Sequence, residues 1–266
     1  MANILVLDIE TAPMEAAVWG MWQQNVSVAM MEKEGYLLCY SAKWLGDDSI
    51  MYGDGRIKKG KAPVAADEKR LLKSLIPLLN KADMVLGHNL TKFDMPKIRG
   101  RCLVHKLDLP SPYREIDTCK SARKEFGFES NSLEFLCNVL DVPTRKSNHA
   151  GFPGYSLWSG CLKGDEKAWA AMQEYNVIDI KTTEDVYIAM RPYMTQHPNI
   201  GIYDSSSEGV KCPKCGSHNL QKRGMAHTNT GQYQRYQCND CRGWARGRTT
   251  ENSIPRRKTL LTNAVS

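Results

Sequence analysis

The 266-residue sequence contains no apolar run of about 18 or more residues, the length that a membrane-spanning helix needs. Its first residues, MANILVLDIE, have neither the basic start nor the small-residue cleavage site of a secretory signal. No segment of about 20–50 residues is repeated, so the sequence lacks the pattern of solenoids and propellers. These absences lead us to expect a globular, cytoplasmic protein with no membrane partner.

Acidic residues are scarce in the C-terminal quarter of the chain. Residues 205–266 contain eleven Lys and Arg against three Asp and Glu, a net charge of +8. Because the whole chain carries +7, residues 1–204 carry only −1. A near-neutral body joined to a basic C-terminal part indicates a polyanionic partner, with a merely soluble surface as the alternative.

Apolar residues follow two periodicities along residues 1–197. Short apolar runs predict strands over 3–7, 36–44, 49–52, 83–87 and 113–118, with a hairpin turn at 46–48. Helical spacing predicts helices over 67–80, 93–103, 132–140 and 166–190, the first of them kinked or shortened by Pro77. Strands that alternate with helices define an α/β domain, and the early hairpin makes its five-stranded sheet mixed.

Three segments carry acidic residues where such a fold could bring them together. Asp8 and Glu10 are spaced i and i+2 in a strand, so both side chains lie on one face. Asp94 follows a strand and begins a helix, at the sheet edge where α/β folds place their sites. Tyr175 and Asp179 are one turn apart on one helical face. Taken singly, each segment has a structural explanation. Asp8 and Glu10 could lie in an exposed turn, Asp94 could cap a helix, and Tyr175 and Asp179 could be ordinary surface residues.

Together, the three segments resemble a known pattern. The stretches DIET at 8–11, GHNLTKFD at 87–94 and YNVID at 175–179 resemble the motifs of the DEDD 3′→5′ exonuclease superfamily, which includes proofreading domains of DNA polymerases. The tyrosine resembles the DEDDy branch, because the sister branch has a histidine where this chain has Glu174. The resemblance covers roughly residues 1–195 and implies a DnaQ-like, ribonuclease H-like fold.

The resemblance also implies a two-metal mechanism that releases nucleoside 5′-monophosphates. Asp8 would bridge two Mg²⁺ or Mn²⁺ ions, which are hard cations that favour carboxylate ligands. Glu10 and Asp179 would complete the site of the ion that activates water, and Asp94 would hold the second ion through water. Tyr175 would orient the attacking water, because a phenol with a pKa of about 10 is not a strong base at neutral pH.

Substrate contacts and partners follow from the same resemblance. Thr11, His88, Asn89 and Lys92 lie within the motifs and are candidate contacts to the terminal nucleotide or its phosphate, with simple loop residues as the alternative. The expected substrate is a single-stranded DNA end, in replication, proofreading or repair. A separate polymerase or replication protein would be the partner in proofreading, since the remaining residues cannot hold a polymerase domain. Such a compact exonuclease would suit a bacterium or a phage-infected cell.

Two other functions stay open at this point. The same superfamily trims RNA, so an RNA 3′→5′ exonuclease is the second enzymatic possibility. A non-catalytic adaptor that binds nucleic acid through an inactive nuclease fold belongs to a different class. The intact set of motif residues argues against the adaptor, because an inactive relative is expected to lose at least one of them.

Four of the nine cysteines are grouped near the C-terminus. Cys212 and Cys215, and then Cys238 and Cys241, form two Cys-x-x-Cys pairs that are separated by residues 216–237. The spacing suits one structural Zn²⁺ in a zinc ribbon, with the metal stabilising a segment that has little core. Disulfides are the alternative, and a reducing cytoplasm disfavours them. The other five cysteines are expected to be reduced and buried.

Aromatic and basic residues alternate inside this cysteine-bearing segment. These residues are Tyr233, Arg235, Tyr236, Arg242, Trp244, Arg246 and Arg248. They suit phosphate contacts and base stacking, with docking onto another protein as the alternative. The expected organisation is therefore an exonuclease domain over 1–197, a linker over 198–210, a zinc ribbon over 211–250 and a basic, flexible tail over 251–266.

Overall fold

The computed structural model describes residues 2–57, 67–144, 151–205 and 209–262. Residues 206–208 of the expected linker and 263–266 of the expected tail lie outside these ranges. The chain divides into two compact units, residues 3–187 and residues 188–266 with the first two residues. None of the helices in the described ranges has the length and apolar composition that crossing a membrane requires.

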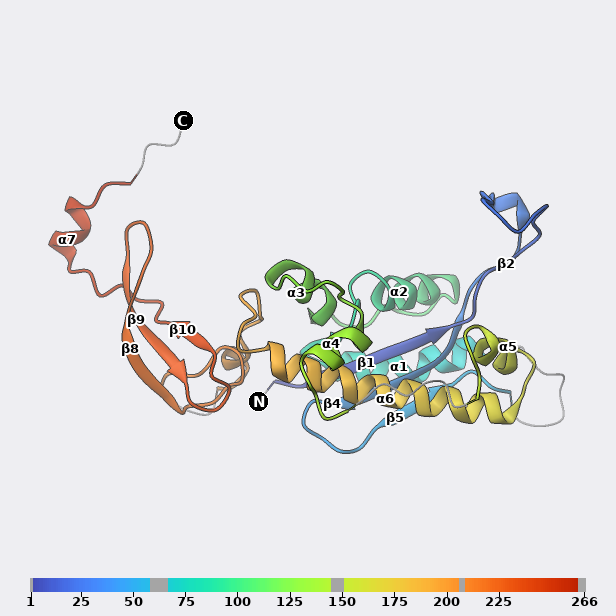
Figure 1. Ribbon diagram of the computed structural model, residues 1–266. Coiled ribbons are helices and arrows are strands. Elements are labelled where there is room, and N and C mark those ends of the chain that lie inside the picture. The colour runs from blue at the N-terminus through green and yellow to red at the C-terminus, as the bar shows by residue number, and fades with distance from the viewer. Residues whose placement is uncertain (1, 58–66, 145–150, 206–208, 263–266) are drawn as a thin grey trace. The chain divides into compact units, whose positions relative to one another are not determined.

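The unit of residues 3–187 contains strands β1, β4 and β5 (Figure 1). With β6 and β7 they form a five-stranded sheet in the order β5-β4-β1-β6-β7. Strand β4 is antiparallel to β1 and β5, whereas β6 is parallel to β1 and β7. The predicted mixed α/β sheet is therefore confirmed. The strands are β1 Ile4–Thr11, β4 Leu37–Trp44, β5 Met51–Asp54, β6 Met84–Gly87 and β7 Arg114–Asp117.

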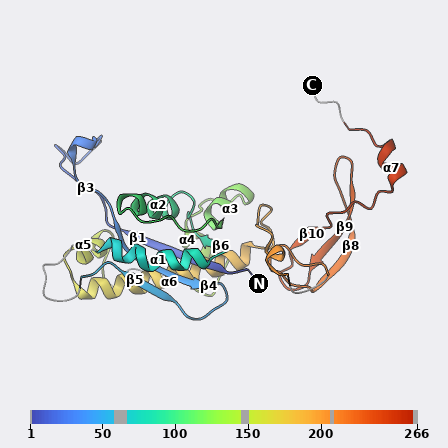
Figure 2. The ribbon, with the colours of Figure 1, turned by 180° about the vertical axis from the view of Figure 1, so that it is seen from behind.

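Helices pack on both faces of this sheet (Figure 2). Helices α1 (Glu68–Lys81) and α2 (Asp94–Val104) share one core with the side chains of Leu5, Leu7 and Ile9 in β1. Helices α5 (Ser156–Leu162) and α6 (Glu166–Met190) form a second core with residues of β4. Because side chains alternate along a strand, the even-numbered residues of β1 face the α5 and α6 side.

Short elements complete the unit. Helices α3 (Thr118–Glu125) and α4 (Leu133–Val139) follow β7. A small two-stranded sheet pairs β2 (Glu15–Ala16) with β3 (Met31–Lys33), which follows the 3₁₀ helix Val28–Met30. Helix α1 continues through Pro77 to Lys81 and is not shortened, because buried Leu71, Leu72, Leu75 and Leu79 hold it against the sheet.

A buried ion pair joins α6 to the sheet. Lys43 in β4 donates to Glu184 in α6, and the amide of Gly46 donates to the other carboxylate oxygen at 2.8 Å. Both side chains of the pair are 9% exposed. The pair ties the helix to β4, next to the strand that carries Asp8 and Glu10.

Replacing Glu184 with glutamine is expected to destabilise this unit by about 3–5 kcal/mol, because it leaves the Lys43 ammonium buried without its counter-charge. Urea unfolding followed by circular dichroism measures the change. Glu174→Gln is the matched control, since Glu174 is an exposed acid on the same helix. Equal stabilities of the two variants would contradict the structural role of the pair.

A second buried carboxylate, Glu68, lies at the start of α1 and is 4% exposed. Burial disfavours its charge, but hydrogen bonds from Arg101, the Leu37 amide and His105 outweigh burial and hold the pKa of Glu68 below its ordinary value of 4.5. Arg101 donates from Nε to both oxygens at 3.0 Å. This carboxylate thus connects α1, α2 and the beginning of β4.

A lowered pKa in the folded state predicts an acid-sensitive contribution to stability. The contribution of Glu68 is present above the ordinary pKa of 4.5 and is lost as the pH falls through the lower, folded-state pKa. Glu68→Gln is therefore expected to lower the melting temperature at pH 7. In acid, the difference in melting temperature between the variant and the wild type is expected to disappear. Thermal melts between about pH 7 and pH 3 test it. Glu34→Gln, which removes an exposed partner of Arg101, is the control.

The C-terminal unit contains a three-stranded sheet in the order β10-β9-β8. The strands are β8 Leu220–His227, β9 Gln232–Cys238 and β10 Trp244–Arg246. A 3₁₀ helix, Ile200–Tyr203, lies in the segment expected to be a loop, and helix α7, Ile254–Thr259, lies in the expected tail. Ser253 caps α7 by accepting a hydrogen bond from the Arg256 amide. The cap is a local helix signal, but residues 251–266 show no apolar periodicity, so this helix was not predicted.

Candidate active site and metal centres

Three acidic side chains from distant segments meet on the α6 side of the sheet. Asp8 and Glu10 project from the same face of β1, and Asp179 comes from α6. One ligand oxygen from each lies within 4.8 Å of the others. Strand alternation therefore supplies two carboxylates and the crossing helix supplies the third.

This group fits a hard divalent cation. Mg²⁺ binds oxygen at about 2.1 Å, so ligands on opposite sides of it are about 4.2 Å apart. The separations within the acidic group, up to 4.8 Å, are close to this span. Carboxylates gathered at such distances repel one another unless a cation lies between them.

Tyr175 lies one helical turn before Asp179 and is 8% exposed. Burial raises the pKa of its phenol, and the charges of Asp179, Glu10 and Asp8 and a hydrogen bond to Asp179 raise it further. Its ring meets that of Trp158 edge to face, with 6.2 Å between centroids. The phenol therefore stays protonated beside the acidic group and can donate a hydrogen bond, but it cannot serve as a base near neutral pH.

Asn176 is part of this site and was not predicted. It is completely buried, and its Nδ2 donates to Oδ2 of Asp8 at 2.5 Å. Asn176 precedes Asp179 by three residues, so both lie on one face of α6. That spacing is the sequence signal that could have indicated it. The hydrogen bond fixes the orientation of the Asp8 carboxylate within the acidic group.

Asn176→Ala is expected to lower metal affinity or turnover by about 10- to 100-fold, as is usual when a partner that orients a metal ligand is removed. The Mg²⁺ dependence of nucleotide release separates the two effects. Gln173→Ala, an exposed position one turn earlier, is the control. A variant that folds and keeps the wild-type Mg²⁺ dependence would show that Asn176 serves packing alone.

Asp94 lies beside this group but is not one of its members within the described residues. The side chain is 2% exposed, and its Oδ1 accepts from the amide of Ile9 at 3.2 Å. Burial raises the pKa of Asp94 to about 7, with Asp117 acting in the same direction and the amides of Ile9 and Asp94 opposing it. The structure thus places Asp94 against the backbone between Asp8 and Glu10.

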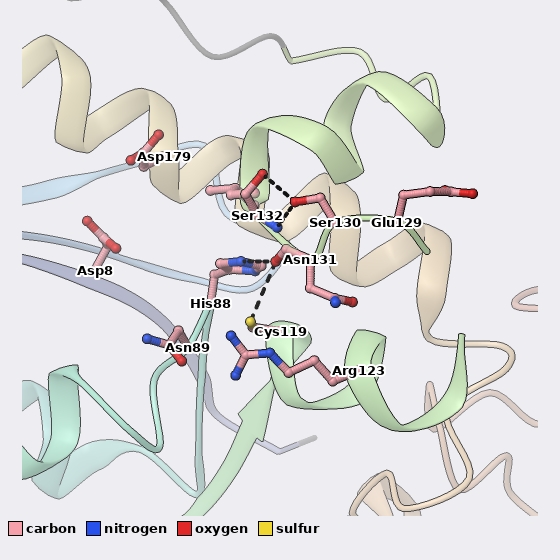
Figure 3. A pocket seen from close by; sticks show the side chains of 11 residues that line it. Asp8, His88, Asn89, Cys119, Arg123, Glu129, Ser130, Asn131, Ser132 and Asp179 are labelled. Atoms are coloured by element: carbon pink, nitrogen blue, oxygen red, sulfur yellow. Dashed lines mark hydrogen bonds between the residues drawn. The ribbon is translucent and has the colours of Figure 1, made fainter. Parts of the chain in front are cut away.

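A cleft with a volume of about 590 Å³ opens next to the acidic group. Figure 3 shows Asp8 and Asp179 together along one part of its wall and Arg123 and Glu129 in other parts. The β6–α2 loop, α3 and residues 129–133 form the remaining wall. The cleft therefore lies against carboxylates on one side and a cationic side chain on another.

His88 and Asn89 both line this cleft (Figure 3). The Nε2 of His88 donates to the carbonyl of Asn131 at 3.0 Å, and its Nδ1 contacts Oγ1 of Thr118 at 2.9 Å. Both ring nitrogens thus bind the protein, so neither is left for a ligand. Asn89 has a φ of 63°, a left-handed conformation that asparagine tolerates better than most residues.

Asp117, which was not predicted, stabilises this loop. Its carboxylate accepts from the amides of Asn89 and Thr91, each at 3.0 Å, and from the amide of Lys120 at 3.0 Å. It therefore caps α3 and shapes the β6–α2 loop at the same time. A local helix cap is visible in the sequence, but its bonds to the loop depend on the pairing of β6 with β7.

The remaining predicted contacts do not line the cleft. Thr11 is half-buried at the end of β1, and Lys92 is exposed in the turn before α2. Neither is among the residues of the cleft wall. Arg123, an exposed residue of α3 that does line it, supplies a positive charge there and was not predicted.

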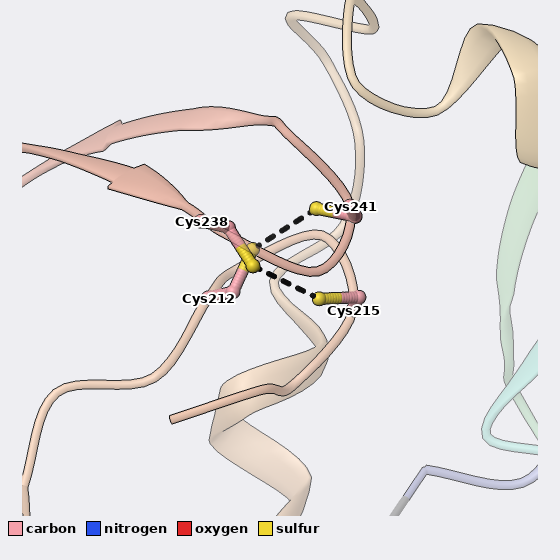
Figure 4. A group of neighbouring side chains, drawn as sticks. All are labelled: Cys212, Cys215, Cys238 and Cys241. Atoms are coloured by element: carbon pink, nitrogen blue, oxygen red, sulfur yellow. Dashed lines mark hydrogen bonds between the residues drawn. The ribbon is translucent and has the colours of Figure 1, made fainter. Parts of the chain in front are cut away.

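The four cysteines of the C-terminal unit come together, two before β8 and two at the β9–β10 turn (Figure 4). The Sγ atoms of Cys212 and Cys241, and those of Cys215 and Cys238, are 3.6 Å apart. A tetrahedral Zn²⁺ with bonds of about 2.3 Å places its sulfurs about 3.8 Å apart, whereas a disulfide needs about 2.05 Å. The group therefore fits zinc better than disulfides.

The backbone around the cysteines repeats the same turn. Gly216 follows Cys215 with a φ of 76°, and Arg242 follows Cys241 with a φ of 64°. A left-handed arginine is unfavourable by itself. Its use in this position indicates that the turn is needed to direct the preceding thiols toward one another.

The mixed sheet with helices on both faces and a carboxylate cluster beside its central strand is typical of ribonuclease H-like folds. The family model described as RNase_H superfamily matches residues 49–191. The match spans more than half of the chain, and the chain belongs to this superfamily. It runs from β5 through α6 and includes Asp94, Tyr175 and Asp179, while Asp8 and Glu10 precede it. A search of curated proteins found no match.

Membership in this superfamily indicates a nuclease-type activity that acts on nucleic acid and uses divalent metal ions.

Proposed function

We propose that the chain is a 3′→5′ exonuclease of the DEDDy type that removes nucleoside 5′-monophosphates from single-stranded DNA. The observation that carries the proposal is the gathering of Asp8, Glu10 and Asp179 within 4.8 Å, with the protonated phenol of Tyr175 bonded to Asp179. A group of three carboxylates, one buried and two half-buried, with a phenol beside it has no structural purpose that packing alone would require.

The carboxylates would hold two Mg²⁺ or Mn²⁺ ions, which lower the pKa of water and offset charge on a phosphate. Asp8, Glu10 and Asp179 are the direct ligands in this proposal, and Asp94 acts through water. Tyr175 donates a hydrogen bond to Asp179, so its oxygen can accept a hydrogen bond from the attacking water and orient it. The water oxygen attacks phosphorus, and the bond to the 3′ oxygen breaks.

The cleft supplies places for the terminal nucleotide. Arg123 and Asn89 line it beside the acidic group, so we propose that they contact a phosphate and the nucleotide, while the ring of His88 forms a wall. Lys92 and Thr11 remain candidate contacts outside the cleft wall. The resemblance of the three motifs supports the 3′→5′ direction and a role in replication, proofreading or repair with a polymerase on another chain.

Degradation of single-stranded DNA labelled at its 5′ end tests this function. A ladder that shortens from the 3′ end with Mg²⁺ or Mn²⁺, and stops with EDTA, is the expected result, with nucleoside 5′-monophosphates as product. A matched RNA strand tests whether DNA is the preferred substrate. Internal fragments without a ladder would contradict exonuclease action, and no metal-dependent cleavage of either strand would contradict the proposal as a whole.

A further inference from the structure

One face of the C-terminal sheet gathers two arginines and two aromatic residues. Arg235 in β9 pairs directly with Arg246 in β10, so their side chains emerge on the same face. Tyr233 and Trp244 are each two residues from one of these arginines along their own strands, which places them on that face as well. We call Tyr233, Arg235, Trp244 and Arg246 the arginine–aromatic face.

Each arginine lies over the aromatic ring of the neighbouring strand. The guanidinium carbon of Arg235 is 5.0 Å from the ring centroid of Trp244, and that of Arg246 is 4.2 Å from that of Tyr233. The Nε of Arg235 also donates to the carbonyl of Arg223 at 2.8 Å. These contacts hold both guanidinium groups next to the aromatic rings, while Trp244 remains 47% exposed.

The arrangement is costly for the sheet alone. Like charges placed directly opposite each other destabilise a pair of strands. Strands β8, β9 and β10 contain no acidic residue to offset the charge of the arginines. Asp240, in the turn between β9 and β10, instead accepts from Ser217 and Asn219. A local conflict of this kind is expected where a surface serves binding.

We propose that the arginine–aromatic face binds single-stranded nucleic acid. The guanidinium groups contact phosphates, and unpaired bases stack on Trp244 and Tyr233. A single strand fits better than a duplex, because only unpaired bases can lay their rings on exposed side chains. This binding site lies in a different unit from the acidic group and does not depend on catalysis.

Fluorescence anisotropy with the zinc-loaded chain of 266 residues and a labelled oligothymidine tests the proposal, in buffer without added Mg²⁺ or Mn²⁺. Trp244→Ala is expected to raise Kd by roughly 5- to 150-fold, the usual effect of losing one stacking partner. Arg246→Gln is expected to reduce the slope of log affinity against log salt by about 0.7, the value for one contact to a single-stranded phosphate. A duplex of equal length is expected to bind more weakly.

Lys222→Gln is the matched control, because Lys222 pairs with Tyr236 and therefore lies exposed on the opposite face of the same sheet. It removes the same charge, and its effect on affinity and slope is expected to be smaller. Zinc content checks that each variant keeps its fold. Unchanged oligothymidine affinity in Trp244→Ala and Arg246→Gln would overturn the proposal and favour a protein partner. Equal losses of oligothymidine affinity in Lys222→Gln and Arg246→Gln would overturn the proposal too.

Because these measurements contain no divalent activator, they stay informative if the chain proves to lack exonuclease activity.

Discussion

The Asp179→Asn variant is expected to release nucleotides about 10³-fold or more slowly than the wild-type chain while keeping its fold. Asparagine has nearly the same shape as aspartate but carries no charge, so the acidic group loses one of its three negative charges. A loss of about 4 kcal/mol in stabilisation of the transition state corresponds to this factor. Asp8→Ala is expected to abolish cleavage as well, with a larger local disturbance because Asn176 loses its acceptor.

The Asp179→Asn substitution lowers the expected activity, but it is not expected to lower the stability of the metal-free protein. Asp8, Glu10 and Asp179 repel one another within 4.8 Å, so removing one charge relieves that repulsion. The melting temperature of Asp179→Asn without metal is therefore expected to equal or exceed that of the wild type. Added Mg²⁺ or Mn²⁺ stabilises a protein that binds it in the folded state, and this rise in melting temperature is expected to shrink in the variant.

Initial rates of nucleotide release and thermal melts with and without Mn²⁺ measure both effects. Glu174→Gln is again the control, because it neutralises an exposed acid on α6 one residue before Tyr175. It is expected to keep the wild-type rate and the wild-type response to Mn²⁺. Full activity of Asp179→Asn would exclude this residue from the proposed metal site, and a melting temperature that falls sharply would mean that its role is structural.

The sheet and the longest helices could be predicted because each has a strong local signal. The apolar run ILVL indicated β1, and the spacing of leucines over residues 71–79 indicated α1. Strand alternation and helical spacing also predicted that Asp8 and Glu10 share a face, and that Tyr175 and Asp179 share one. The structure brings Asp8, Glu10 and Asp179 together, although the role of each residue stays a prediction.

Other features depended on contacts that no local pattern encodes. The bond from Asn176 to Asp8 joins residues 168 positions apart. Helix α3 is short and polar, with Cys119 and Ala122 as its buried apolar residues, so its periodicity was too weak to detect. Arg123 was missed with it, and the cleft wall that it helps to form was missed for the same reason.

The C-terminal unit leads to the second large expected effect. Cys238→Ser is expected to abolish zinc binding and to unfold the three-stranded sheet, while residues 3–187 stay folded. The buried core around the four-cysteine group consists of Cys212, Cys238 and Cys241, with Cys215 and Leu220 packed against it. A segment of about 40 residues with so little apolar burial cannot fold on hydrophobic contacts alone.

Binding of structural zinc contributes about 10–16 kcal/mol in comparable small sites, which exceeds what such a segment can gain from packing. Serine is a poor zinc ligand at neutral pH, so three thiolates are left to hold the ion. Metal analysis is expected to fall from about one zinc per chain to none. Limited proteolysis is then expected to cut within residues 211–250, where the wild-type chain resists. Chelation of the wild-type protein is expected to have the same effect.

Cys102→Ser controls for the loss of a thiol, because Cys102 is buried in α2, in the other unit. It is expected to retain zinc and protease resistance in the sheet, even where its own packing suffers. A Cys238→Ser chain with an intact sheet would mean that packing and the turns after Cys215 and Cys241 suffice without metal. Because the arginine–aromatic face is built on this sheet, the zinc-free variant is also expected to lose its affinity for oligothymidine. Loss of zinc, of protease resistance and of oligothymidine binding in the same variant would connect the four thiols to that surface through the fold of the sheet.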